Sequence, residues 1–182
     1  LHSLPTRRSS DLGGFDGAHV GHRKLISRAR EYGLPVGAMT IGGGKGTKNL
    51  FTFSEREDIF RSLFVDFIFE LPFSEIRDMS CEEFIRVLFE RFSPRAFVCG
   101  EDFRFGKGAE GTPERIKNLT RVSVEVQKLV RMNGEKVSSS LVKRLLEEGD
   151  AARAAKVLGE PFFLKGEVIK DRQVGRLMGF PT

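Results

Sequence analysis

Apolar residues recur along this chain at two different spacings. Leu25, Ile26, Ala29 and Tyr32 lie at intervals that predict one face of an amphipathic helix over 19–32. The short apolar run 36–41 predicts a buried strand instead. Further strands are predicted at 65–71, 95–99 and 122–130, and further helices at 54–64, 80–92, 112–119, before 149 and at 150–158. Because strands alternate with helices, the pattern predicts an α/β fold with a parallel sheet and flanking helices.

Signals for helix starts accompany this pattern. Ser54 and Ser80 are each followed three positions later by a glutamate, Glu57 and Glu83, which is the spacing of a capping box. Thr112 precedes the helix predicted at 112–119, where a threonine side chain can cap the first turn. The starts of three helices are therefore predicted, two from a serine–glutamate pair and one from a single threonine.

The two ends of the chain do not fit the pattern. Residues 1–12 show no helical or strand period and lack the apolar core of a signal peptide. We predict that they are a non-native leader outside the fold. Glu160-Pro161 breaks the helix at 150–158, and residues 162–170 alternate like a strand. A second unit is therefore predicted to begin at residue 159.

Composition and charge narrow the class of protein. The chain is 40% hydrophobic and carries a formal net charge of +5, which favours anionic partners. Its basic residues are interspersed with acidic ones, so we predict phosphorylated small molecules as partners and no nucleic acid. No apolar run is long enough to span a membrane, and no membrane partner is predicted. Cys81 and Cys99 lack C-x-x-C spacing, which indicates reduced thiols in a cytoplasmic protein.

The stretch 14–22 contains the strongest candidate for chemistry. His19 and His22 lie three positions apart, and both imidazoles are predicted to project from one face at the start of a helix. The unpaired N–H groups at a helix N-terminus attract phosphate. Gly17 and Gly21 would let a ligand approach the backbone closely. Such a site suits transfer of a nucleotidyl group, which needs positioned donors more than a protein nucleophile.

Other interpretations of these histidines stay open. An H-x-G-H sequence is short, and two histidines at this spacing are often polar surface or N-cap residues. A zinc site needs three or four ligands, whereas His2 is the third histidine and the two cysteines lie far away in the sequence. We therefore predict no resident metal.

Two further segments carry candidate binding residues. Asp102, Phe103, Arg104 and Phe105 form a loop flanked by glycines, and they could either hold a flat ring or anchor the loop in the core. Three serines precede the helix that ends at 149, with a lysine one turn further on, namely Ser138, Ser139, Ser140 and Lys143. This second segment is either a plain N-cap or a second anion site.

Four stretches together resemble the bacterial bifunctional riboflavin kinase/FMN adenylyltransferases, the FAD synthetase family. They occur in the family's order, as Gly14-Phe15-Asp16-Gly17-Ala18-His19-Val20-Gly21-His22, Gly100-Glu101-Asp102-Phe103-Arg104-Phe105-Gly106, Val137-Ser138-Ser139-Ser140 with Gly149-Asp150, and Gly175-Arg176 with Gly179-Phe180-Pro181-Thr182. The resemblance implies a Rossmann-like nucleotidyltransferase domain of the HxGH superfamily over 13–158. It also implies a buried first strand before Gly14, which we expect to be missing or polar here.

The resemblance further implies the reaction and its site. ATP, entering with Mg²⁺, would adenylylate FMN to give FAD and pyrophosphate. His19 and His22 would be catalytic. ATP would also contact Gly14, Phe15, Asp16, Gly17, Ser138, Ser139, Ser140 and Lys143, and the flavin would contact Asp102, Phe103, Arg104 and Phe105.

This sequence departs from the family pattern in two places. The usual T-F-x-P-H-P segment is replaced by residues 40–44, Thr-Ile-Gly-Gly-Gly, and the Gly/Lys run that continues to 48 lacks phosphate-loop order and is predicted to be a surface loop. In the I-S-S-T-x-I-R pattern, Ser140 replaces threonine and Lys143 replaces arginine. Lysine keeps the charge but loses the bidentate fork, so weaker phosphate binding is expected.

The last residues resemble the opening of the riboflavin kinase barrel, through Gly175, Arg176, Pro181 and Thr182. A few residues cannot close a barrel, so we predict a truncated start over 159–182 and no kinase activity. Two rival functions remain at this point: another HxGH nucleotidyltransferase, and a non-catalytic flavin or nucleotide binder.

Overall fold

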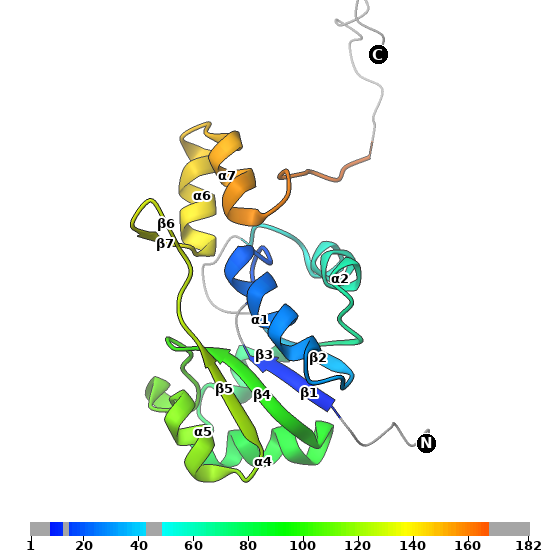
Figure 1. Ribbon diagram of the computed structural model, residues 1–182, viewed down its shortest axis with the longest axis vertical. Helices are drawn as coiled ribbons and strands as arrows, with labels where there is room; N and C mark the ends of the chain where they lie inside the picture. Colours follow the sequence, from blue (N-terminus) through cyan, green and yellow to red (C-terminus); the bar gives the residue numbers. More distant parts are fainter. Residues whose placement is uncertain (1–7, 13–14, 43–48, 168–182) are drawn as a thin grey trace, which may run out of the picture.

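A five-stranded parallel sheet forms the centre of the computed structural model, which describes residues 8–12, 15–42 and 49–167 (Figure 1). Its strand order is β3-β2-β1-β4-β5, and every pairing is parallel. The strands are β1 (Arg8–Leu12), β2 (Val36–Gly42), β3 (Phe67–Pro72), β4 (Pro94–Gly100) and β5 (Ser123–Gln127). This order is that of a Rossmann-like sheet, so the predicted fold class is confirmed.

The central strand β1 contradicts the prediction that residues 1–12 lie outside the fold. The expectation that the first strand would be missing or polar holds in its second form, since the sequence of β1 is RSSDL. Residues 9–12 pair with 36–39 of β2 on one side and with 96–99 of β4 on the other. The sheet is therefore not short of a strand in front of the histidine turn. Strand pairing uses backbone N–H and C=O groups, which two flanking strands offer whatever side chains lie between them. The side-chain pattern, on which the prediction depended, did not indicate this strand. That residues 1–12 are a leader stays a prediction.

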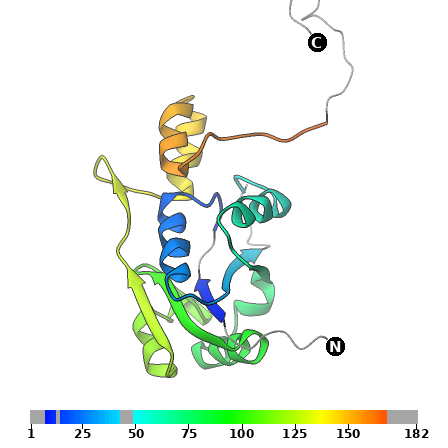
Figure 2. The same ribbon diagram turned by 45° about the vertical axis from the view of Figure 1, so that its right-hand side comes forward.

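Helices cover both faces of the sheet (Figure 1 and Figure 2). On one face α1 (Val20–Arg30) and α2 (Phe53–Ser62) pack in one core cluster; on the other, α4 (Cys81–Phe92) and α5 (Pro113–Leu119) pack in a second cluster. Successive strand residues point to opposite faces. Accordingly Ala38 of β2 belongs to the first cluster, and the next residue, Met39, belongs to the second.

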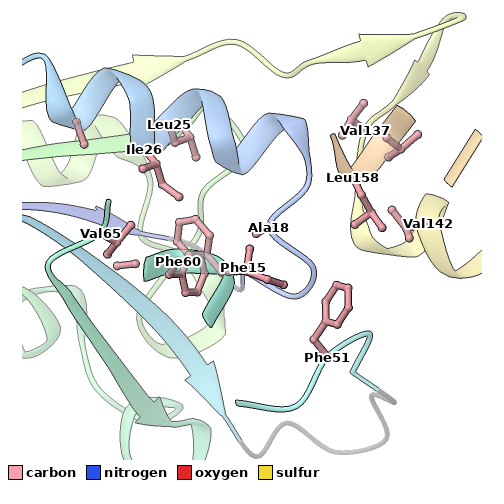
Figure 3. Close-up of a cluster of buried hydrophobic side chains, with 14 of the residues drawn as sticks. Phe15, Ala18, Leu25, Ile26, Phe51, Phe60, Val65, Val137, Val142 and Leu158 are labelled. Carbon is pink, nitrogen blue, oxygen red and sulfur yellow. The ribbon is translucent and has the colours of Figure 1, made fainter. Parts of the chain in front are cut away.

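The first cluster joins the sheet to the histidine turn. Figure 3 shows Phe15 and Phe60 packed together beneath Ile26. The rings of Phe15 and Phe60 meet edge to face with centroids 5.4 Å apart, and both side chains are fully buried. The turn that precedes α1 is thereby anchored in the core by its own aromatic residue.

Two further helices, α6 (Ser139–Glu147) and α7 (Ala151–Leu158), pack beside the N-terminal end of α1 (Figure 1). Arg23 of α1 links them to the turn, because its Nε donates to the backbone oxygens of Ala18 at 3.1 Å and Leu158 at 2.9 Å. A short hairpin precedes α6, made of β6 (Arg131–Met132) and β7 (Glu135–Lys136). The start of α6 is thus held close to the start of α1.

Local predictions are mostly confirmed, with several corrections. The capping box at Ser80 and Glu83 and the cap at Thr112 are present. The box predicted at Ser54 and Glu57 is wrong, since α2 is capped two residues earlier by Thr52 and Glu55. Residues 162–167 form no strand, because Phe162 and Phe163 pack on Phe51 instead of continuing the alternation. Two short helical segments were not predicted, α3 (Phe73–Ile76) and η1 (Lys107–Ala109).

Within the part of the chain that the structure describes, no helix is long and apolar enough to cross a membrane.

The corrected cap gives a first prediction. Thr52→Ala removes the side-chain oxygen that accepts from the Glu55 N–H and the hydroxyl that donates to the Glu55 carboxylate. We expect it to lower the free energy of unfolding by about 1 kcal/mol, measured by urea denaturation. Ser54→Ala is the matched control, because Ser54 is exposed and lies two residues after Thr52; it is expected to change stability by less than about 0.5 kcal/mol. A larger loss for Ser54→Ala than for Thr52→Ala would restore the original assignment.

Candidate functional site

A cavity of about 670 Å³ opens where the strands β1, β4 and β5 end. Its walls come from four segments: the turn and first residues of α1, the loop after β4, the segment after β5, and the junction of β7 with α6. In the same order, the lining residues lie within 15–25, 100–104, 127–130 and 136–139, and Ile41 and Asn49 complete the lining. This is the size of a small-molecule pocket, and parallel sheets bind ligands at the carboxyl ends of their strands. The four segments are distant in sequence and meet only here.

The turn before α1 adopts an unusual backbone. Phe15 and Ala18 have positive φ angles of 38° and 39°, and Gly17 has a φ of 95°. A Cβ on Gly17 would lie 2.7 Å from the Leu50 side chain. Gly17 does not line the cavity; the structure therefore explains this glycine by its backbone angle and by packing on Leu50. Gly21 does line the cavity.

Both histidines line the cavity and stack on each other. His19 is the N-cap of α1, and its Nδ1 accepts from the backbone N–H of His22 at 3.4 Å. The two rings are nearly parallel at 12°, with centroids 3.7 Å apart, and the Phe15 ring lies 4.5 Å from that of His22. The N-cap interpretation is therefore correct for His19, and it is compatible with a place in the site.

Burial keeps both imidazoles neutral near pH 7. Burial is the main reason that the pKa of His19 falls from 6.5 to about 4, and the Lys136 cation acts in the same direction. The backbone hydrogen bond of His19 and the Asp102 and Asp16 carboxylates partly offset the shift. Burial, together with neighbouring His19, holds the pKa of His22 well below 6.5. Nδ1 of His22 is buried and has no hydrogen-bond partner among the described residues. Such an unsatisfied atom is unfavourable, so a partner supplied by a ligand would be stabilising.

Asp16 binds three segments together. Its Oδ1 accepts from the Leu50 N–H at 2.8 Å, and its Oδ2 lies 2.8 Å from Nζ of Lys143. Its backbone oxygen accepts from the Ser139 hydroxyl. Lys143 was predicted to hold a triphosphate, but it does not line the cavity and contacts the turn through Asp16.

The serines at the start of α6 occupy different environments. Ser138 is the N-cap, and its Oγ accepts from the Leu141 N–H at 3.2 Å. Ser138 and Ser139 both line the cavity, whereas Ser140 is exposed and does not. Ser138 is therefore both the N-cap of α6 and a residue of the cavity wall.

The loop after β4 places some of its residues at the cavity and another in the core. Asp102, Phe103 and Arg104 line the cavity. Phe105 does not; it is buried in the second core cluster, with its ring 5.2 Å from Phe84. The rings of Phe103 and Phe105 stack 5.6 Å apart, so the core residue supports the one at the cavity.

Sequence reasoning missed several cavity residues. They are polar or cationic side chains on α1, between β2 and α2, at the end of β5 and at the end of β7, namely Lys24, Asn49, Gln127, Lys128 and Lys136. Residues 127–130 were assigned to a strand, but β5 ends at Gln127. Because the predicted strand ran on to residue 130, its end did not point to Gln127 or Lys128, and no signal in the sequence pointed to Asn49.

Some predicted residues lie outside the described part of the chain: Gly14, the loop residues 43–48, and Gly175, Arg176, Pro181 and Thr182. Their predicted roles stay predictions.

Several known proteins are similar to this chain in sequence. The profile of the FAD synthetase family matches residues 3–141. A bifunctional riboflavin kinase/FMN adenylyltransferase of Buchnera aphidicola subsp. Schizaphis graminum is 28% identical over 100% of this chain and 64% of its own length. The protein of the same description from Bacillus subtilis is 32% identical over 94% of this chain and 59% of its own length. This chain therefore spans about three fifths of the length of these two relatives.

A solved structure shows the same fold. The crystal structure of a macrolide-efflux protein from Streptococcus pneumoniae superimposes with a TM-score of 0.88 at 26% identity, over 98% of this chain and 64% of that one. A shared fold does not transfer a role, so the efflux description is not carried over to this chain.

The lowered pKa of His19 predicts a pH dependence of stability. Folded His19 stays neutral down to about pH 4, whereas the unfolded chain protonates it near 6.5. The unfolded state therefore binds more protons between these values, and stability falls as the pH drops through that window. Between pH 7.5 and 5.0, urea denaturation should show a loss that is about 2 kcal/mol larger for the wild type than for His19→Gln. Equal pH dependence in the two proteins would show that His19 is not buried as described.

Proposed function

The chain belongs to the FAD synthetase family, and on that premise we propose that it transfers the adenylyl group of Mg-ATP to FMN, giving FAD and pyrophosphate. The observation that carries the proposal is the stacked pair His19 and His22 at the N-terminus of α1, in the wall of a cavity large enough for a nucleotide. The same cavity is lined by two of the three other stretches that resemble the family.

The histidines act as hydrogen-bond donors to the phosphates. Burial keeps both rings neutral, so each offers one N–H to a phosphoryl oxygen. Negative charge on bound phosphates favours the imidazolium form, which strengthens the same bonds as charge passes to the departing pyrophosphate. Donors fixed in position before the reaction contribute the most when charge develops in the transition state.

The acceptor supplies its own nucleophile. A phosphate monoester has a second pKa near 6 and is mostly a dianion at pH 7. One of its oxygens attacks the α-phosphorus of ATP, forming the new P–O bond. The bond from the α-phosphorus to the oxygen bridging to the β-phosphorus breaks, and pyrophosphate leaves. No side chain has to take a proton or form a covalent intermediate.

Substrate binding follows from the remaining walls. The N-terminus of α6 with Ser138 and Ser139 receives the triphosphate, while Lys143 positions the histidine turn through Asp16. Phe103 stacks on the flavin, and Asp102 and Arg104 reach its polar edge. Within the described ranges no three metal-ligating side chains gather, which suits Mg²⁺ that arrives on the phosphates of its nucleotide. We place the reaction in the cytoplasm, the compartment that the absence of C-x-x-C spacing between Cys81 and Cys99 favours.

The test is formation of FAD and pyrophosphate from FMN and Mg-ATP by this chain and by His22→Ala. We expect kcat to fall about 100- to 1,000-fold in the variant, because a fixed donor to the transferred phosphoryl group is lost. Circular dichroism and flavin binding of the variant control for folding. Riboflavin in place of FMN checks the prediction that kinase activity is absent.

Two outcomes would contradict the proposal. A folded wild-type chain that binds FMN and Mg-ATP without forming FAD would be a non-catalytic binder. Faster adenylylation of phosphopantetheine or of a nicotinamide mononucleotide than of FMN would make the chain another HxGH nucleotidyltransferase.

A further inference from the structure

Lys136 stands at the junction of the hairpin with α6, and neither the predicted motifs nor the proposed mechanism gives it a role. It lines the cavity, and its Nζ is paired with the Asp102 carboxylate, which lines the same cavity. Both charges act on His19: the lysine lowers the pKa of this histidine and the aspartate raises it. The pair therefore lies within electrostatic range of the reacting groups.

The cavity carries more positive than negative charge. Its lining includes four cations, Lys24, Arg104, Lys128 and Lys136, and two carboxylates, Asp16 and Asp102. Asp16 is already neutralised by Lys143, which lies outside the lining. This excess of positive charge favours a ligand with negative charge. Of the four cations, Lys136 lies closest in sequence to the N-cap Ser138.

The bond between Lys136 and Asp102 is easy to exchange. The two side chains are 45% and 46% exposed, and exposed ion pairs commonly shift an equilibrium by less than about fivefold. A charge-assisted bond from an ammonium group to phosphate contributes more, roughly ten- to a hundredfold. A phosphate that reaches Nζ therefore competes successfully with the aspartate.

The backbone around Lys136 is held independently of this pair. The preceding residue, Glu135, is bound by Arg144 of α6 at 2.6 Å and by Arg153 of α7 at 3.7 Å. The next residue, Val137, is buried, and its N–H donates to the Val130 oxygen at 2.9 Å. Exchange of the lysine's partner thus requires only a change of side-chain rotamer.

From these observations we propose that Lys136 is a phosphate-binding residue of the site, held ready by Asp102 and transferred to a phosphate group of a bound substrate. The inference rests on the proposed function, since it needs a phosphorylated substrate in this cavity. The phosphate belongs either to FMN or to ATP, and both sources present the same chemistry to an ammonium group.

The test measures binding rather than turnover, on the whole chain and on Lys136→Met. Each substrate is compared with its counterpart that lacks phosphate: FMN with riboflavin by flavin fluorescence, and Mg-ATP with adenosine by calorimetry. We expect a ten- to hundredfold loss of affinity for one phosphorylated ligand and no loss for its counterpart. Loss for FMN alone assigns the FMN phosphate, and loss for Mg-ATP alone assigns the triphosphate. Lys136→Arg should restore most of the affinity, because it restores the charge.

Glu135→Gln is the matched control. It removes the hairpin's ion pairs with Arg144 and Arg153 but leaves the cavity lining unchanged. We expect its ligand affinities to equal those of the wild type, because the bond from the Val137 N–H to the Val130 oxygen still holds the backbone next to Lys136. An equal loss in Glu135→Gln and Lys136→Met would mean that Lys136 merely anchors the hairpin, which overturns the inference.

Other outcomes also decide the matter. Unchanged affinities in Lys136→Met, or equal losses for riboflavin or adenosine and their phosphorylated counterparts, overturn the inference while leaving the proposed function intact. A wild-type chain that binds neither FMN nor Mg-ATP overturns both.

Discussion

The site depends above all on how the turn before α1 is held. Three of its residues, Phe15, Gly17 and Ala18, have positive φ angles, a conformation that is unfavourable for residues with a Cβ and persists only when surrounding contacts enforce it. Asp16 supplies these contacts, through bonds to Leu50, Ser139 and Lys143 from two distant segments. The fully buried Phe15 ring adds a hydrophobic anchor. Without this fixed turn the two histidines would have no defined position relative to α6.

Burial gives the histidine pair its chemical character. Stacked against each other and against Phe15, the rings are too poorly solvated to carry charge near pH 7. Positive charge in the cavity is supplied by lysine and arginine around the rings. In the proposed function the site separates two tasks: exposed cations would attract anionic substrates, and the imidazoles, neutral before substrate binds, would direct hydrogen bonds at the transferred group. Neutral donors cost less to bury than charged ones would.

The same core residues support the fold and the site. Phe105 lies in the core and packs against Phe103 at the cavity, and Arg23 joins α1 to the last turn of α7 through backbone oxygens. Lys143 reaches the turn through Asp16 rather than lining the cavity. Residues that the motifs group together therefore divide into those that face the cavity and those that keep the others in place.

The local sequence pattern by itself determined most of the helices and strands and two of the three predicted helix caps. It also placed the histidine pair at the start of a helix. These features depend on residues three or four positions apart. The pattern misplaced the cap of α2, where Thr52 with Glu55 and Ser54 with Glu57 offer the same spacing and only the packed helix selects between them. It also failed at β1, because pairing to β2 and β4 comes from backbone groups distant in sequence. Only the tertiary structure brought Lys136, Asp102 and His19 to one cavity, since strand ends far apart in the chain become neighbours only when the sheet forms.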